Sequence, residues 1–253
     1  MNSLIFKHYL KRSYRNILDL VLVIGIPLGF IAINAVVGDM ELIDGYNIGA
    51  SITAVFLVLS FQFFGTWLVF QFLFTDIKSK MRLRLGAAPC GVNKFIFSAI
   101  AASWIYSVVA GGVVIAVSTV VFNVYWGNPM VFAIVFLLTS LVGSLICILL
   151  FFYAKKLSQA SAIHYVICFG FMIAGNLMFN LFGVPFVDGI LANALTYINP
   201  LTIGTHAVLG SGFIGELLPF ISEGRAVVDV SILTGFALVL AVIVGIVGRR
   251  RTF

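Results

Sequence analysis

The stretch Asp76-Ile-Lys-Ser-Lys-Met-Arg-Leu-Arg-Leu-Gly-Ala-Ala-Pro-Cys-Gly-Val-Asn-Lys94 is the most charged interior segment of this 253-residue chain, and long apolar runs flank it. Its basic residues are Lys78, Lys80, Arg82, Arg84 and Lys94. A charge at the centre of a bilayer costs several kcal/mol, so we expect an aqueous loop between two membrane spans. Thr75 and Asp76 are candidate N-caps for a short helix in this loop, and Gly86 with Pro89 would end it.

Composition identifies the class of protein. Hydrophobic residues make up 62% of the chain and charged residues only 9%, whereas soluble domains are about 25% charged. At about 20 residues per span, the length allows roughly six helices and leaves no room for a separate soluble domain. Because the apolar segments are long and continuous, they favour helices over a β-barrel. We therefore expect an all-α integral membrane protein with one transmembrane domain over residues 1–253.

Six membrane spans are expected. Their predicted ranges are 17–37, 48–74, 95–122, 130–153, 162–182 and 227–247. Before them, residues 2–16 place apolar side chains on one face and basic ones on the other, as is typical of an interfacial helix. Pro27 is expected to bend the first span, and Asp19 is expected to pair with basic residues near its inner end.

The connections outside the membrane are of two kinds. Residues 38–47 and 123–129 are predicted to be outer turns. The segment 184–226 is too interrupted by Gly and Pro for two spans and too apolar for a solvated loop. Its pieces 190–198 and 201–209 are predicted to be short, re-entrant helices that enter the outer leaflet or cap the bundle, because irregular backbone at that depth needs protein or a water cavity around it.

The basic residues fall on one predicted side of the membrane. Of the 15 Lys and Arg, 14 lie in segments assigned to that side, and only Arg225 lies on the other. This is the positive-inside pattern, which predicts a multi-pass protein of the cytoplasmic membrane with both termini in the cytoplasm. The same placement argues against a nucleic-acid partner despite the net charge of +6.

Familiar catalytic and ligand-binding patterns do not occur. The chain has no Gly-x-x-x-x-Gly-Lys-Ser/Thr, His-Glu-x-x-His or Gly-x-Ser-x-Gly sequence, so no nucleotide-binding, metal or catalytic residue is predicted. His8, His164 and His206 are far apart without acidic neighbours at ligand spacing, and each is expected to be interfacial or hydrogen-bonded. The cysteines indicate no disulfide framework. Since Asp19 and Asp229 lie at span ends, ion-driven transport is disfavoured.

Two spans carry polar side chains at helical spacing. Gln62 and Thr66 are four residues apart in the second span, as are Asn176 and Asn180 in the fifth, so each pair shares a helix face. Polar residues in apolar spans should face protein or a cavity rather than lipid. They either line a path for a solute or form hydrogen bonds between helices, and the sequence leaves both roles open.

The order of these elements resembles that of the ABC-2 type transporter permeases, the six-span subunits of ATP-driven exporters with the type V fold. The resemblance rests on the amphipathic N-terminal segment, on the stretch Asp76–Pro89, which ends in Arg-Leu-x-x-x-Pro, and on Tyr197-Ile-Asn-Pro-Leu201 between the fifth and sixth spans. The family usually has a Glu and a Gly early in the inner loop, where this chain has Lys78 and Lys80.

The resemblance implies partners and site residues. Two permeases, identical or similar, would associate with two subunits that bind ATP and Mg²⁺, so this chain would need no cofactor and would not itself be an enzyme. An inner-loop coupling helix would fit a groove on the ATPase. Its residues would be Asp76, Lys78, Lys80, Met81, Arg82, Leu83, Arg84, Leu85 and Pro89. The translocation path would lie between the permeases, lined by the second and fifth spans, including Gln62, Thr66, Asn176 and Asn180.

A path of amides and aromatics without fixed charge favours a hydrophobic or amphipathic compound such as a drug, a peptide or a lipid-like molecule. The main alternative is a self-sufficient secondary carrier or channel. A membrane-embedded enzyme is disfavoured, since no nucleophile triad, carboxylate pair or metal cluster is apparent. The basic inner loop is also explained by the positive-inside bias alone. The sequence leaves open whether the permease pairs with itself or with a sister chain.

Overall fold

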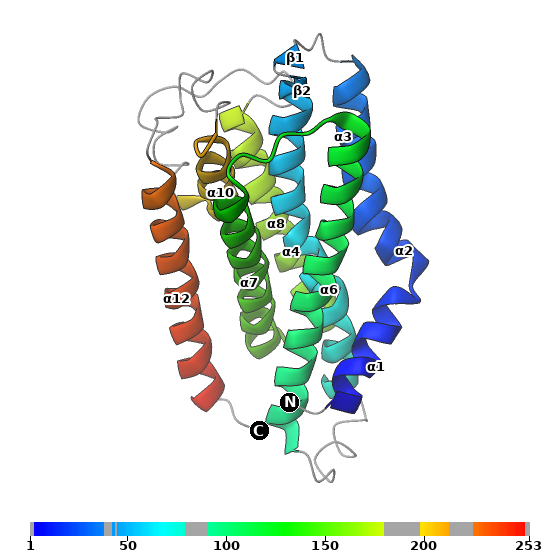
Figure 1. The fold of residues 1–253 in the computed structure, drawn as a ribbon. Coiled ribbons are helices and arrows are strands. Elements are labelled where there is room, and N and C mark those ends of the chain that lie inside the picture. The colour runs from blue at the N-terminus through cyan, green and yellow to red at the C-terminus, as the bar shows by residue number, and fades with distance from the viewer. Residues whose placement is uncertain are drawn as a thin grey trace.

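The computed structural model describes residues 3–37, 42–43, 45–78, 91–179, 198–212 and 225–250. In these ranges the protein is a bundle of helices (Figure 1), six of which are long and apolar enough to cross a membrane. In the described ranges the secondary structure is thus helical apart from one hairpin whose two strands have two residues each. This architecture is compatible with a multi-pass membrane protein.

The elements follow one another along the chain in this way. The N-terminal helix is α1 (Ser3–Tyr14), and the first span consists of α2 (Ile17–Leu20), the π-helical turn η1 (Val21–Gly25) and α3 (Ile26–Val37). A hairpin of β1 (Leu42–Ile43) and β2 (Tyr46–Asn47) leads to α4 (Ile48–Lys78). The remaining helices are α6 (Gly91–Phe122), α7 (Pro129–Tyr153), α8 (Leu157–Phe179), α10 (Pro200–Leu209) and α12 (Ala226–Arg250). Each of the six predicted spans overlaps one of these helices or, for the first span, the run from α2 to α3, and the described ends differ from the predicted ones by at most five residues.

The bundle has two distinct ends. The hairpin and α10 lie at one end, which we call the α10 end, whereas α1 and the last turn of α12 lie at the other, the α1 end (Figure 1). The predicted turn at Lys155 and Lys156 joins α7 to α8, and the turn at 123–129 joins α6 to α7. In the latter turn Asn123 and Gly127 have positive φ angles of 50° and 66°, which allows the chain to reverse over a few residues.

The helix at the centre of the bundle is α4. Of the residues in its most apolar stretch 94% are buried, compared with 17% in α8 and 11% in α12. A helix that is apolar all round is buried in a protein core or spans a membrane, and α4 packs against α3, α6, α7, α8 and α10. The outer helices instead expose large apolar side chains such as Val120, Phe169 and Val239, which suits contact with lipid tails.

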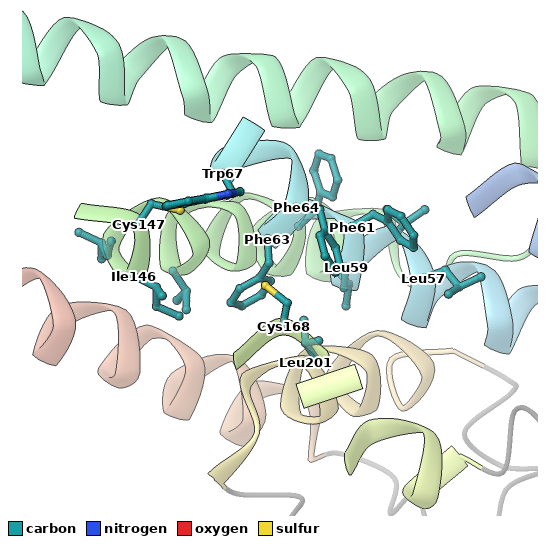
Figure 2. Packing of buried hydrophobic residues seen from close by; sticks show 14 of the residues in the cluster. Leu57, Leu59, Phe61, Phe63, Phe64, Trp67, Ile146, Cys147, Cys168 and Leu201 are labelled. Carbon is teal, nitrogen blue, oxygen red and sulfur yellow. The ribbon is translucent and has the colours of Figure 1, made fainter. Parts of the chain in front are cut away.

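Aromatic and sulfur-containing side chains fill the core around α4 (Figure 2). The Trp67 ring stacks on His164 of α8, with ring centroids 4.7 Å apart. The thiol of Cys168 lies 3.2 Å from Nε2 of His164, and Cys147 approaches the same ring from α7. Both thiols are buried and are not joined in a disulfide. These side chains therefore connect α4, α7 and α8 in the core.

The expected helix start at Thr75 or Asp76 is wrong. The helix α4 continues through both residues to Lys78, and the Thr75 hydroxyl donates to the Gln71 carbonyl one turn earlier, at 2.8 Å. A side chain that bonds back in this way belongs to a helix interior and not to an N-cap. At the other end of the basic stretch, α6 already begins at Gly91. Residues 79–90 lie outside the described ranges.

The first span departs from regular α-helix beside Pro27. The π-helical turn η1 ends two residues before this proline. Proline has no N–H and its ring crowds the carbonyl four residues earlier, so the widened turn relieves that crowding. Asp19 is buried in α2, and its Oδ2 atom has no hydrogen-bond partner in the described part of the chain. The expected pairing of Asp19 with a basic residue is therefore absent from the described residues.

Two adjacent glycines in α6 give a matched test of this packing. A Cβ atom added to Gly111 would collide with Gln62 of α4 and lie 2.8 Å from the Phe136 ring of α7, whereas one added to Gly112 would meet nothing within 4 Å. We expect Gly111→Ala to destabilise the protein by about 1–3 kcal/mol. Gly112→Ala should be neutral or stabilising by up to about 1 kcal/mol. Thermal unfolding in detergent measures both, and equal melting temperatures would contradict the packing.

Candidate functional site

A polar contact at the α1 end ties the N-terminal helix to the central one. The Tyr9 hydroxyl donates to Oδ2 of Asp76 at 2.8 Å, and Nη1 of Arg12 lies 3.2 Å from the same oxygen. The Arg12 guanidinium also lies 4.2 Å from the centre of the Phe72 ring. Because Tyr9 and Arg12 are three residues apart, they share one face of α1. We call these four side chains the α1–α4 junction.

The charges of the α1–α4 junction suit its position. Asp76 lies in the last turn of α4, where the helix dipole disfavours a negative charge. The guanidinium of Arg12 and the hydroxyl of Tyr9 offset that effect by neutralising and hydrogen-bonding the carboxylate. Burial, followed by the neighbouring carboxylate of Asp76, raises the pKa of Tyr9 well above its ordinary value. The hydroxyl consequently remains a proton donor throughout the physiological pH range.

The α1–α4 junction stands directly before the basic stretch on which the predicted coupling site depends. Of the predicted coupling residues, Asp76 is in the junction, and Lys78 is the last residue of α4, with a side chain that the structure does not describe. The others lie outside the described ranges: Lys80, Met81, Arg82, Leu83, Arg84, Leu85 and Pro89. The basic stretch continues directly from the end of α4 at Lys78, two residues after Asp76, and Asp76 is the residue at which α1 is attached.

The predicted path residues of the second span lie between helices. Oε1 of Gln62 accepts a hydrogen bond from the Ser107 hydroxyl of α6 at 2.7 Å. The Thr66 hydroxyl donates to the Phe63 carbonyl at 2.9 Å and lies 3.7 Å from the Cys147 sulfur of α7. Gln62 and Thr66 are both fully buried. In this structure they therefore have the interhelical role that the sequence left open, and lining a path stays a prediction.

The predicted path residues of the fifth span are less well described. Asn176 lies in α8, near the α10 end, but its side chain is not among those described. Asn180 lies outside the described ranges. The structure thus brings Gln62 and Thr66 together in the core, and it does not test whether the two asparagines face them.

Of the sequence Tyr197–Leu201, residues 198–201 are described, and they begin α10. Oδ1 of Asn199 accepts a hydrogen bond from the Leu201 amide and so caps α10, with Pro200 in the first turn. Nδ2 of Asn199 donates to the Phe171 carbonyl of α8 at 2.8 Å. Asparagine followed by proline is a typical helix start. The predicted short helix at 201–209 is confirmed, and every residue of α10 is buried. Most of the predicted helix at 190–198 lies outside the described ranges.

The structure also brings together two ionisable residues that the sequence analysis treated separately. Nδ1 of His206, in the last turn of α10, lies 2.5 Å from Oδ2 of Asp229, in the first turn of α12. Both side chains are at most 3% exposed. The expectation that His206 is hydrogen-bonded is confirmed, but its acidic partner was missed because 23 residues separate the two. The available signal was an ionisable residue in each of two apolar segments, since each needs a partner.

Comparisons with known proteins leave the family open. No model of a known protein family matches this chain, and no curated protein matches it in sequence. In the described ranges, no group of three or more His, Cys, Asp or Glu side chains is arranged to hold a metal ion. The functional argument therefore rests on the residues and contacts of the chain itself.

The α1–α4 junction can be tested by hydrogen exchange. Replacing Asp76 with alanine removes the acceptor of both Tyr9 and Arg12, and hydrogen bonds to a charged group contribute about 1.5–3 kcal/mol. We expect the amides of α1 to exchange roughly ten- to a hundredfold faster in Asp76→Ala. Arg15→Gln, which changes an exposed basic residue just after α1, is the control and should leave exchange unchanged. Equal exchange in Asp76→Ala and the unmodified protein would refute the junction.

Proposed function

We propose that this chain is the permease subunit of an ATP-driven exporter of the ABC-2 type. It would move a hydrophobic or amphipathic compound, such as a drug, a peptide or a lipid-like molecule, across the cytoplasmic membrane. The observation that carries the proposal is the α1–α4 junction, which fastens an N-terminal helix to the central helix just where the basic stretch begins. Such an attachment is what a subunit needs if an external motor moves its inner loop.

Orientation follows from the distribution of charge. The basic segments among the described residues, α1 and the turn at Lys155 and Lys156, belong to the α1 end, and the last turn of α12 lies there too (Figure 1). Arg225 precedes the first residue of α12, towards the α10 end. By the positive-inside rule, we assign the α1 end to the cytoplasm, with both termini on that side. The basic stretch would then face a cytoplasmic partner.

The energy source in this proposal is a separate subunit. The chain has no nucleotide-binding sequence, so ATP and Mg²⁺ would be held by a partner ATPase. Arg82 and Arg84 can pair with acidic residues of a groove, and Met81, Leu83 and Leu85 supply apolar anchors. Stable docking surfaces combine such an apolar centre with a polar rim. Two permeases, identical or similar, would complete the assembly.

The central position of α4 supplies a route for the motion. A load applied next to Asp76 acts on a helix of 31 residues that packs against most of the bundle, including α10 at the opposite end. Long helices transmit displacement because their backbone hydrogen bonds hold them rigid. The proposal includes the path-lining roles of Gln62, Thr66, Asn176 and Asn180. For Gln62 and Thr66 it requires α4 to separate from α6 and α7 during the cycle, since both are buried there.

One observation favours the alternative, a self-sufficient secondary carrier. The buried pair of His206 and Asp229 is an ionisable site in an otherwise apolar bundle, and such residues often mark ion pathways in transporters. A carrier would transport solute in vesicles that contain this chain alone with an ion gradient. An exporter permease would require the ATPase as well as ATP.

The docking surface can be tested by charge reversal. Arg82→Glu with Arg84→Glu should abolish co-purification of the ATPase and ATP-dependent transport, because the new acids would face an acidic groove. The matched control is Lys155→Glu with Lys156→Glu, which reverses two exposed charges at the same end of the bundle. It should leave both properties intact. An ATPase that still co-purifies with the Arg82 and Arg84 variant, in normal stoichiometry, would exclude this docking site.

A further inference from the structure

We propose that His206 and Asp229 form a proton-binding site at the α10 end of the bundle, in which one shared proton holds α10 against α12. The site is independent of the energy source proposed above, because neither residue belongs to the basic stretch or to the α1–α4 junction. Its ligand is a proton, which can enter and leave a pair too closely packed for any larger ion. Three features of the structure support the site: its geometry, its helix dipoles and its surroundings.

The geometry is that of a short, buried hydrogen bond between two separate helices. Nδ1 of His206 and Oδ2 of Asp229 are 2.5 Å apart and therefore in direct hydrogen-bonding contact. The side chains are 3% and 2% exposed. Since a carboxylate can only accept a hydrogen bond, and an imidazole nitrogen must carry a proton to donate one, the contact requires a proton between the two atoms.

The helix dipoles favour the charged form of this pair. Asp229 lies in the first turn of α12, where exposed backbone amides favour a negative charge. His206 lies in the last turn of α10, where free carbonyl groups favour a positive charge. Both helices therefore stabilise an imidazolium beside a carboxylate. The reverse arrangement, an acid on α10 and a histidine on α12, would oppose both dipoles.

Among the described residues, the helices packed against α10 carry few other charged or titratable side chains. The helices packed against α10 are α4, α7, α8 and α12. Between Ile48 and Thr75, α4 has no Asp, Glu, Lys, Arg or His; α7 has none along its length and contributes only Cys147 and Tyr153 as titratable groups. The titratable residues of α8 are His164, Tyr165 and Cys168. Arg225, one turn before Asp229, is exposed, and its carbonyl accepts the Asp229 amide at 3.0 Å.

The net charge of the pair decides how protons act on it. With an imidazolium and a carboxylate the pair is neutral overall. Loss of a proton leaves one net negative charge, and gain of a proton leaves one net positive charge. A net charge in an apolar interior is strongly disfavoured, so either change weakens the hold of α12 on α10. Because α10 also contacts α4 and α7, proton exchange would alter packing at this end of the bundle.

A double-mutant cycle at several pH values tests the proposal. The variants are Asp229→Asn, His206→Gln and the two together, in the full chain in lipid nanodiscs, with melting temperature as the readout. Near neutral pH each single variant should lower the melting temperature by roughly 6–20 °C. The melting temperature of the double variant should fall by less than the sum of the two single decreases, and the difference measures the coupling between the two residues. This coupling should shrink on acidification, as the carboxylate takes a proton, and again at alkaline pH. Coupling that does not change with pH would show a purely structural hydrogen bond and overturn the proposal.

Two further measurements guard against variants that fail to fold. NMR of the unmodified protein with ¹⁵N-labelled histidine should show, near neutral pH, one imidazole protonated on both nitrogens and assignable to His206. His8 is identified by His8→Gln on α1, and His164 by the ring-current shift from its stacking on Trp67. A neutral His206 would overturn the proposal. Arg225→Gln, which removes an exposed charge nearby, should leave the spectrum unchanged. A shift of the His206 signal in this variant would show that Arg225, and not Asp229, determines the charge of His206, and would overturn the proposal.

Discussion

The constraint on which the structure depends is the exclusion of charged side chains from its central helix. The central helix α4 is surrounded on all sides, and the whole of its length from Ile48 to Thr75 carries no charged side chain. Asp76 is the first charged residue of α4, and its carboxylate contacts Arg12 and Tyr9 of α1. At the opposite end of the bundle, Asp229 lies in the first turn of the apolar helix α12 and contacts His206. The ion pair of Arg12 with Asp76 and the contact of His206 with Asp229 thus lie at opposite ends of the bundle.

Between these two contacts the bundle has a closely packed centre. The centre is held by stacked rings, by close approaches at Gly111 and Gly143, and by hydrogen bonds such as that of Gln62 to Ser107. Close packing of this kind resists gradual deformation. The contacts at the two ends involve charged or ionisable side chains. In the proposed exporter, the α1–α4 junction would receive motion from the ATPase, and the pair on α10 and α12 would respond to the opposite compartment.

Much of the fold could be predicted from sequence because its signals are local. Apolar runs predict the six helices long enough to span a membrane, and the apolar piece at 201–209 predicts the short helix α10. The start of a new helix at Thr75 was predicted wrongly, since a capping residue and a helix-interior residue look alike when α4 can continue into water. The partners of Asp76 and His206 could not be predicted, because separations of 64 and 23 residues leave no periodic trace. For Gln62 and Thr66, their spacing predicts a shared polar face but not which helix that face contacts.

The central claim is that this bundle is moved by a separate ATP-hydrolysing subunit that grips its basic inner stretch. The most direct measurement is native mass spectrometry of the tagged chain, released gently from its own membrane in the presence of a non-hydrolysable ATP analogue. The account predicts an assembly of two permeases and two nucleotide-binding subunits, which loses the nucleotide-binding subunits when Arg82 and Arg84 are replaced by glutamate. A chain recovered alone, or only with copies of itself, and active in transport in that state, would contradict it.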